Sequence, residues 1–339
     1  MIATPSHSRQ ETAVADMLQH TIEHDYHHPT LRHNNNIWTI DPHYDPHRPT
    51  LLLNAHIDTV KPVSTWTRPP YQPTIEGDTL YGLGSNDDGA SVVSLLTAYH
   101  ILTQSHTLGY NLVFLASAEE EVSGAQGIES VIPLLPKIDV ALIGEPTSMQ
   151  PAQAEKGLMV IDATAHGVSG HAARNTGDNA IYHALDDINW LRSHTLPRVS
   201  PLLGPVKTTA TIINAGTQHN VIPDSCTFTI DVRSNECYTN QEILDILQHA
   251  CRSTLRPRSL RLSSSHIAAD HPLLQRAVAL GRTPFGSPTL SDQALMPWPS
   301  MKMGPGESTR SHTADEHIHI SEIREAIELY VEMLQGLEL

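Results

Sequence analysis

A histidine and a carboxylate follow a short apolar stretch, Leu51–Val60, early in the chain. Three consecutive leucines predict a buried strand that runs directly into His56 and Asp58. Alternation along a strand puts these two side chains on the same side. A histidine at a strand end with a carboxylate two residues later is a frequent pairing of a metal ligand with the group that orients it. Because the chain has 22 histidines, the same pattern also arises by chance at a solvated strand end.

Further acidic and histidine residues occupy other predicted strand ends or the loops beside them. They are Asp87 in a glycine-rich loop, Glu119–Glu121 after the predicted strand Asn111–Ala116, Glu145 after Val140–Ile143, and His312 after Gly304–Gly306. Each has an ordinary alternative, such as a helix N-cap for Asp87 or a solvated turn for the glutamates. The carboxyl ends of strands in an open α/β sheet are where ligands bind. Together these residues indicate a functional site at this edge, and carboxylates with histidines suit hard and borderline metal ions.

The elements that position these residues alternate between strand and helix, which predicts an α/β fold with a mostly parallel sheet. A capping-box pattern at Ser8–Glu11 predicts a first helix that runs to Ile22. The pattern changes near Lys156 to strand–helix–strand–strand–helix–strand, which is typical of a ferredoxin-like α+β layer. We therefore predict one α/β domain formed by residues 1–156 and 265–339, with an inserted domain at residues 157–264; the family resemblance given below implies that the first is catalytic and the second a lid or dimerisation domain.

Composition narrows the classes of function. The chain has 339 residues, with 21 basic and 37 acidic side chains and a net charge of −16. This balance argues against nucleic acid and anionic membranes as partners. The three cysteines lack a CxxC spacing, which is typical of reduced thiols in a cytosol. No stretch approaches the roughly 20 apolar residues of a membrane span, and no signal peptide is evident, so we expect a cytoplasmic protein.

Six short motifs, taken in order, resemble the di-zinc exopeptidase and deacylase family that includes acetylornithine deacetylase, succinyl-diaminopimelate desuccinylase and carboxypeptidase G. They are HID at 56–58, GLGSND at 82–87, AEEE at 118–121, GEPTS at 144–148, VSGHAA at 168–173 and SHTADE at 311–316. The resemblance covers almost the whole chain. GEPTS and SGH are rather specific, and the intact GEPTS with a short chain looks most like the acylornithine deacylases.

The resemblance implies two zinc ions, for which cobalt or manganese are substitutes. His56 and Glu145 would hold one ion, Glu121 and His312 would hold the other, and Asp87 would bridge both. Asp58 would orient His56, and Glu120 would be the general base. This assignment agrees with general chemistry, because a water shared by two divalent ions has a lowered pKa and a neighbouring carboxylate can take its proton.

The resemblance also gives the inserted domain a role in a homodimer. His171 would enter the active site of a partner subunit and stabilise the oxyanion. Asn220 and Arg233 match substrate-binding positions, and Arg233 is our candidate for an α-carboxylate. Arg310, two residues before His312, is a weaker candidate for the carboxylate of a succinyl group. Surface positions are the alternative for all four residues.

The sequence departs from the family pattern at two places. Glu119 stands where the family often has aspartate, so the register of base and ligand within Glu119–Glu121 stays open by one residue. After Asp87, the usual lysine and glycine are replaced by Asp88, Gly89 and Ala90, which removes a positive charge near the metals.

The expected function is a cytosolic, homodimeric, zinc-dependent amidohydrolase that removes an acetyl or succinyl group from ornithine in arginine biosynthesis. A related desuccinylase, an acetylcitrulline deacetylase, a dipeptidase and a non-catalytic binding protein on the same fold remain as alternatives. A small N-acyl amino acid is the expected ligand.

Overall fold

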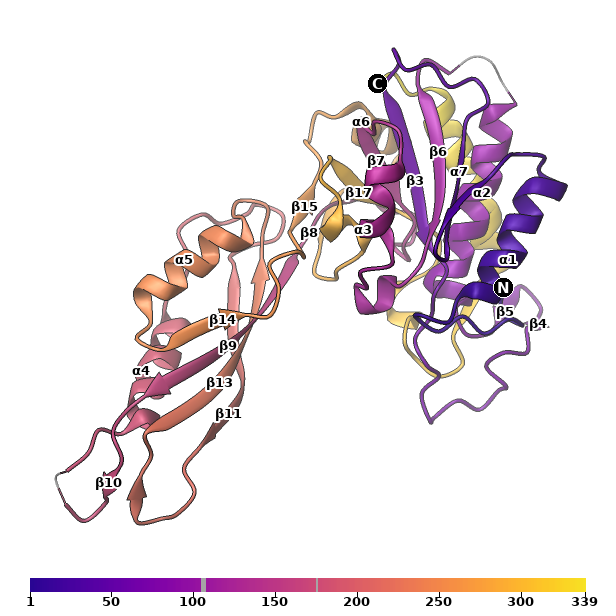
Figure 1. The fold of residues 1–339 in the computed structure, drawn as a ribbon. Coiled ribbons are helices and arrows are strands. Elements are labelled where there is room, and N and C mark those ends of the chain that lie inside the picture. The colour runs from indigo at the N-terminus through magenta and orange to yellow at the C-terminus, as the bar shows by residue number, and fades with distance from the viewer. Residues whose placement is uncertain (105–107, 175) are drawn as a thin grey trace. The chain divides into compact units, whose positions relative to one another are not determined.

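The computed structural model describes residues 1–104, 108–174 and 176–339, and the described chain forms two compact units (Figure 1). Unit 1 consists of Met1–Gln153, His266–Phe285 and Ser291–Leu339. Unit 2 consists of Ala154–Ser265 and Gly286–Leu290. The second, short segment of unit 2 was not part of the inserted range expected from the sequence.

The large sheet of unit 1 has four parallel strands at its centre, in the order β6–β3–β7–β17. Antiparallel strands flank them on both sides. The strands along the sheet are β1 (Leu31–His33), β2 (Asn36–Ile40), β6 (Asn111–Ser117), β3 (Thr50–His56), β7 (Val140–Ile143), β17 (Ser300–Lys302), β8 (Ala152–Glu155) and β15 (Ser265–His266), with β16 (Phe285–Ser287) paired to β8. Every residue of β3 and β6 is buried, as expected for strands covered on both faces.

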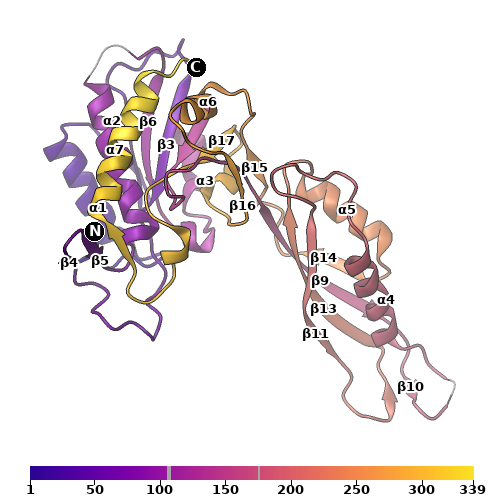
Figure 2. The ribbon, with the colours of Figure 1, turned by 180° about the vertical axis from the view of Figure 1, so that it is seen from behind.

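Helices cover both faces of this sheet (Figures 1 and 2). The helices and helical turns of unit 1 are α1 (Thr12–His20), a π-helical turn (Thr21–Asp25), a second one (Ser85–Gly89), α2 (Ala90–Thr103), α3 (Ile128–Val131), α6 (Pro272–Ala279) and α7 (Ile320–Gln335), with 3₁₀ turns at Glu120–Val122, Ile132–Leu134, Asp292–Leu295 and Ser308–Arg310. Leu51 and Leu53 pack in a core with α1, α2, α6 and α7, whereas Leu52 packs in another with α3. The predicted α/β fold with a mostly parallel sheet is therefore confirmed.

A small antiparallel sheet lies beside the loops of unit 1. It has the order β18–β5–β4 and consists of β18 (His317–His319), β5 (Thr79–Tyr81) and β4 (Thr74–Glu76). The strand β18 leads directly into α7. Among the described residues, no helix is long and apolar enough to cross a membrane.

Two details of the predicted elements of unit 1 are wrong. The capping box at Ser8–Glu11 does not form, because α1 begins only at Thr12 and its N-cap residue Glu11 makes no capping bond. The carboxylate of Glu11 instead accepts hydrogen bonds from the Arg9 backbone and the Asn35 side chain. The helix expected near Ala125–Leu134 is reduced to the four residues of α3 and a 3₁₀ turn, where Pro133 lacks the N–H that an α-helix needs.

Unit 2 has a four-stranded antiparallel sheet in the order β11–β13–β9–β14. Its elements are β9 (Gly157–His166), α4 (Ala180–Ser193), β11 (Lys207–Ala215), β13 (Ser225–Ser234), α5 (Asn240–Ala250) and β14 (Thr254–Pro257), and β10 (Gly170–His171) pairs with β12 (Val221–Ile222) in a separate ribbon. Numbered within the unit, the main strands lie in the order 2-3-1-4 with two crossing helices. The predicted ferredoxin-like layer is confirmed.

The last helix of that layer ends earlier than expected, and the last strand both begins and ends earlier. The sequence pattern suggested a helix to Leu255 and a strand at Ser259–Ser263, but α5 stops at Ala250 and β14 begins at Thr254. The carboxylate of Asp187 accepts the backbone N–H groups of Arg252 and Ser253, at 3.0 and 2.9 Å. These bonds hold the chain in a turn where a helix would otherwise continue.

Candidate metal centre

The carboxyl ends of four parallel neighbouring strands share one edge of the large sheet. His56 ends β3, the glutamate turn follows β6, Glu145 follows β7, and the loop after β17 carries His312. The loop that carries Asp87 precedes α2. The topology thus brings together the six side chains that the sequence offered as base and metal ligands.

Asp87 lies between the two histidines. Its Oδ1 atom is 3.1 Å from Nε2 of His56, and its Oδ2 atom is 3.5 Å from Nε2 of His312. Two ligands of one tetrahedral zinc ion, each bound at about 2.0–2.2 Å, are separated by roughly 3.3 Å. One carboxylate therefore faces both histidines at separations suited to sharing a metal ion with each, which is the geometry of a bridging ligand.

The glutamate turn directs its three side chains to different places. Oε2 of Glu121 is 2.9 Å from Nε2 of His312, and Oε2 of Glu120 is 4.0 Å from Nε2 of His56. Glu119 accepts a hydrogen bond from the backbone N–H of Gln126 and belongs to neither group of clustered ligand atoms. The geometry thus favours Glu120 and Glu121 over Glu119 in the register that the sequence left open.

Two overlapping groups of side chains have ligand atoms close enough for metal ions. His56, Asp87 and Glu121 form one group, and His56, Glu120 and Glu145 form the other, with all ligand atoms of a group within 4.8 Å of one another. Imidazole and carboxylate donors at this spacing fit divalent ions such as Zn²⁺.

The electrostatics of the cluster also fit cations. Burial raises the pKa of Glu120 well above its ordinary value, and the nearby Glu145 carboxylate adds to this effect. Burial lowers the pKa of His56, but hydrogen bonds with Asp58 and Asp87 outweigh this effect and raise it well above its ordinary value. Contact with Glu121 raises the pKa of His312 to about 9. Several buried carboxylates around two imidazoles are stabilised by positive charge, which divalent ions supply.

Asp58 does more than orient His56. Nδ1 of His56 lies 2.9 Å from the backbone carbonyl of Asp58, whereas the nearest carboxylate oxygen is 3.6 Å away. That carboxylate instead accepts the backbone N–H groups of Glu120 and Glu121, at 3.0 and 3.2 Å. The buried aspartate therefore fastens the turn that presents the base and a ligand, and its backbone orients the histidine.

Glu316 is a residue of the site that sequence reasoning missed. Its buried carboxylate accepts the backbone N–H groups of Gly84, Asn86 and Asp87, each at 2.9 Å. Burial raises the pKa of Glu316 to about 7, although these three bonds act in the opposite direction. The signal was present, since Glu316 closes the motif SHTADE. Its function as an anchor for the Asp87 loop could be recognised only once the structure showed which backbone groups it binds.

Two more buried acidic side chains, Asp88 and Asp292, form hydrogen bonds with residues of the strands that lead into the cluster. Oδ2 of Asp88 accepts the backbone N–H of His56 at 3.3 Å, so this residue supports the histidine and is not a member of either ligand group. Asp292 accepts hydrogen bonds from Asn54 and Ser117, at 3.0 and 2.6 Å, and burial raises its pKa to about 6. Nothing near Asp292 in the sequence marked it as part of this region.

The candidates of unit 2 fall at two separate places. His171 on β10 and Asn220 beside β12 are both exposed, and the backbone carbonyl of Asn220 accepts the N–H of Ala172 at 3.0 Å. Strand β13 begins at Ser225, shortly after β12, and Arg233 lies near its other end. The Arg233 guanidinium already makes a two-point ion pair with Asp231, at 2.9 and 3.1 Å.

Arg310 is also engaged within its own unit. Its guanidinium donates to Glu322 at 2.6 Å and lies 3.3 Å from Glu307. Only 14% of its side chain is exposed. These contacts hold the loop that carries His312 against α7. They also pair the positive charge of Arg310, which the sequence analysis assigned to the carboxylate of a succinyl group, with two glutamates of the same unit.

Comparison with known proteins agrees with this geometry. The model of peptidase family M20/M25/M40 matches residues 52–336, which is most of the chain. The chain belongs to this family. The matched region contains all six clustered side chains, both fastening carboxylates and the whole of unit 2.

Solved structures share the fold of this M20-family chain at low sequence identity. Aminopeptidase PepT from Bacillus cereus superposes with a TM-score of 0.78 at 18% identity, covering 98% of this chain and 95% of that one. The YXEP protein of Bacillus subtilis, described as a dinuclear metal-binding peptidase of the M20 family, gives 0.73 at 17%, with coverage of 98% and 94%. The metallo-carboxypeptidase Sso-CP2 of Sulfolobus solfataricus gives 0.72 at 16%, with coverage of 98% and 96%. At these identities the likeness concerns the fold.

Proposed function

We propose that this M20-family metallohydrolase removes an acetyl or succinyl group from the amino group of a small amino acid, with ornithine as the expected amine. The observation that carries the proposal is Asp87 placed between His56 and His312, with Glu120 beside them. The choice of an acyl-ornithine rests on the resemblance of the ordered motifs, and of GEPTS above all, to the acylornithine deacylases.

The proposed metals are two zinc ions. His56 and Glu145 would hold one, Glu121 and His312 would hold the other, and Asp87 would be shared. When bound, such a pair lowers the pKa of a water molecule and polarises the carbonyl of the amide to be cleaved. The distances of Asp87 from both histidines and of Glu121 from His312 support this assignment, as does the presence of His56 and Glu145 in one group of clustered ligand atoms. The choice of zinc follows from the imidazole and carboxylate donors.

A side chain of the protein transfers the proton in the proposed reaction. Glu120 takes a proton from the attacking water and returns it to the leaving amine, as a carboxylate with a raised pKa can do. Asp58 holds Glu120 and Glu121 through their backbone N–H groups, and Glu316 holds Asp87 in the same way. These bonds fix the base and two ligands before substrate arrives, so little reorganisation is needed during the reaction.

Arg233 is proposed to bind the α-carboxylate of the substrate. Lys207 lies directly opposite it across the β11–β13 pair, and like charges in that position destabilise a sheet unless an anion compensates them. Burial and the positive charges of Lys207 and Arg233 lower the pKa of Lys156, so the three cations lie close together. Asp231 supplies one negative charge to this cluster, and a substrate carboxylate supplies a second.

His171 is proposed to act on a partner subunit within a homodimer, and Asn220 is proposed to bind substrate. Unit 2 offers a surface for such a partner, because β11 is an edge strand whose Ile212 and Ile213 are exposed. Helix α4 adds the exposed side chains of Tyr182 and Leu185. Edge strands with exposed apolar groups are usually covered in the assembled protein, and a second copy of this chain covers them without a further partner.

The test is a hydrolysis panel with the zinc-loaded protein. We expect turnover of N-acetylornithine or N-succinylornithine to exceed that of N-acetylcitrulline, succinyl-diaminopimelate, and simple di- and tripeptides. Faster cleavage of the peptides would replace the deacylase assignment by a peptidase, an activity named for several proteins that share this fold. Zinc binding without turnover of any substrate would favour the non-catalytic binding protein.

A further inference from the structure

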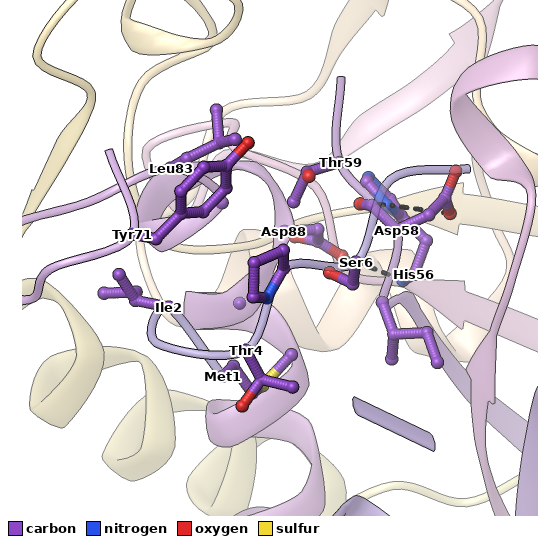
Figure 3. A pocket seen from close by; sticks show the side chains of 14 residues that line it. Met1, Ile2, Thr4, Ser6, His56, Asp58, Thr59, Tyr71, Leu83 and Asp88 are labelled. Carbon is purple, nitrogen blue, oxygen red and sulfur yellow. Dashed lines mark hydrogen bonds and ion pairs between the residues drawn. The ribbon is translucent and has the colours of Figure 1, made fainter. Parts of the chain in front are cut away.

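The segment that precedes α1 crosses the loop that follows β3. The backbone N–H of Thr59 donates to the carbonyl of Ser6 at 2.9 Å, and His7 pairs with Thr59 in a β-bridge. The ring of His7 also lies 2.9 Å from the hydroxyl of Tyr71. Ser6, Asp58 and Tyr71 line one small pocket together with His56 (Figure 3). The segment is thus fixed against the loop that carries Asp58.

One side chain of this segment reaches the Asp58 carboxylate. The hydroxyl of Ser8 donates to Oδ2 of Asp58 at 2.7 Å. The same oxygen accepts the backbone N–H of Glu121 at 3.2 Å, while Oδ1 accepts that of Glu120 at 3.0 Å. Asp58 is completely buried, so water does not replace a lost donor. Ser8 therefore supplies the shorter of the two hydrogen bonds to Oδ2.

Among the described residues, the Ser8 hydroxyl makes a hydrogen bond only with Asp58. The sequence pattern suggested that Ser8 caps the first helix, but α1 begins four residues later and its N-cap is Glu11. Ser8 also precedes residue 52, where the match to the family model begins. Its position is explained by its contact with Asp58.

We propose that Ser8 is a positioning residue of the metal centre, acting through Asp58 on Glu120 and Glu121. Without the hydroxyl, the Asp58 carboxylate loses its bond from Ser8 and can turn toward Nδ1 of His56, which lies 3.6 Å from Oδ1. The two backbone N–H groups that it fastens then lose alignment, and the base and one ligand shift with them. This inference rests on the proposed metal-dependent function.

The experiment compares Ser8→Ala, Ser8→Thr and the control Ser6→Ala. The control removes a hydroxyl from the same segment that makes no hydrogen bond with another described residue. The first readout is hydrogen exchange of the Glu120 and Glu121 amides in metal-free protein, which requires neither metal nor substrate. The second is zinc affinity by competition with a chelator, and the third is kcat and KM on the best substrate of the panel.

We expect faster amide exchange in Ser8→Ala and zinc binding weaker by roughly 10–100-fold, the usual effect of losing a group behind a metal ligand. The value of kcat should fall while KM stays near that of the wild type. Ser8→Thr should restore all three readouts, and Ser6→Ala should leave them unchanged.

Three results would overturn the inference, and they can be told apart. If Ser8→Ala and Ser6→Ala both match a wild-type protein that binds zinc, the Ser8 role is wrong and the proposed function stands. If the wild type itself binds no zinc, both the proposed function and the Ser8 role fail. Slower turnover of Ser8→Thr than of Ser8→Ala also contradicts the role, because a hydroxyl would then be harmful.

Discussion

The candidate residues of unit 1 and those of unit 2 differ in how they are held. In unit 1, the buried carboxylates of Asp58 and Glu316 accept backbone N–H groups from the loops that carry Glu120, Glu121 and Asp87. In unit 2, His171 and Asn220 are exposed beside a short two-stranded ribbon. The comparison indicates that unit 1 fixes its candidate metal ligands within its own fold, whereas the roles proposed for the unit 2 residues depend on a partner or substrate.

The largest expected effect concerns the base in unit 1. Glu120→Gln should lower kcat by roughly 10²–10⁴-fold, because the amide cannot accept the proton from water. It should keep its metals, whereas Glu121→Gln should lose one of them. Glu119→Gln is the matched control, since Glu119 lies outside both ligand groups. Rates and elemental analysis of the three variants would contradict the assignment if Glu119→Gln were the inactive one.

The next effect tests whether unit 2 acts across a dimer. His171→Ala should lower kcat by roughly 10²–10³-fold, the usual result of losing an oxyanion donor, while both metals stay bound. Mixing it with inactive Glu120→Gln subunits should restore part of the activity, because one site of each mixed dimer then pairs an intact base with an intact His171. If mass spectrometry demonstrates subunit exchange and no activity returns, His171 does not act on a partner.

A smaller effect is expected from the fastening of the Asp87 loop. Glu316→Gln replaces a carboxylate by an amide whose NH₂ group cannot accept the N–H groups of Gly84, Asn86 and Asp87. Zinc affinity should fall by roughly 10–100-fold. Glu325→Gln, at an exposed position on α7, is the control. Equal zinc affinities for the two variants, measured by chelator competition, would show that the Asp87 loop needs no such anchor.

The smallest effects concern the arginines. Arg233→Lys should raise KM for every acyl-amino acid tested, because lysine cannot make the paired contact with a carboxylate. Arg310→Ala tests the weaker acyl assignment, in which succinylated substrates suffer more than acetylated ones. Since Arg310 is already paired with Glu322 and Glu307, we expect equal losses for both acyl groups, which would remove it from acyl selection. An unchanged KM for Arg233→Lys would remove Arg233 from the substrate site.

Much of the fold and of the ligand set could be predicted from the sequence, for a physical reason. Buried parallel strands read as apolar runs, and their carboxyl ends must meet at one edge, so strand order predicts that His56, the Glu119–Glu121 run and Glu145 lie close together. Their individual roles were implied by the resemblance of the motifs. The alternating pattern of β9 and β13 likewise revealed the inserted layer. These features depend on local periodicity, which a single sequence contains.

The rest depends on contacts between residues far apart in the chain. Glu316 meets the backbone of residues 84–87, and Ser8 meets Asp58 fifty residues later. A single sequence does not show which distant group a polar side chain contacts, so neither contact could be identified in advance. The predicted capping box at Ser8 shows the opposite error. The local pattern predicted a helix cap, but the hydroxyl donates to the distant carboxylate of Asp58.

The central claim is that unit 1 holds two metal ions and needs them for hydrolysis. The most direct test measures the hydrolysis rate of the best panel substrate against zinc bound per chain, starting from protein stripped by chelation. We predict no turnover in the stripped protein, recovery on addition of Zn²⁺ or Co²⁺, and saturation at two ions per chain. Full activity in protein that elemental analysis shows to be metal-free would contradict the account.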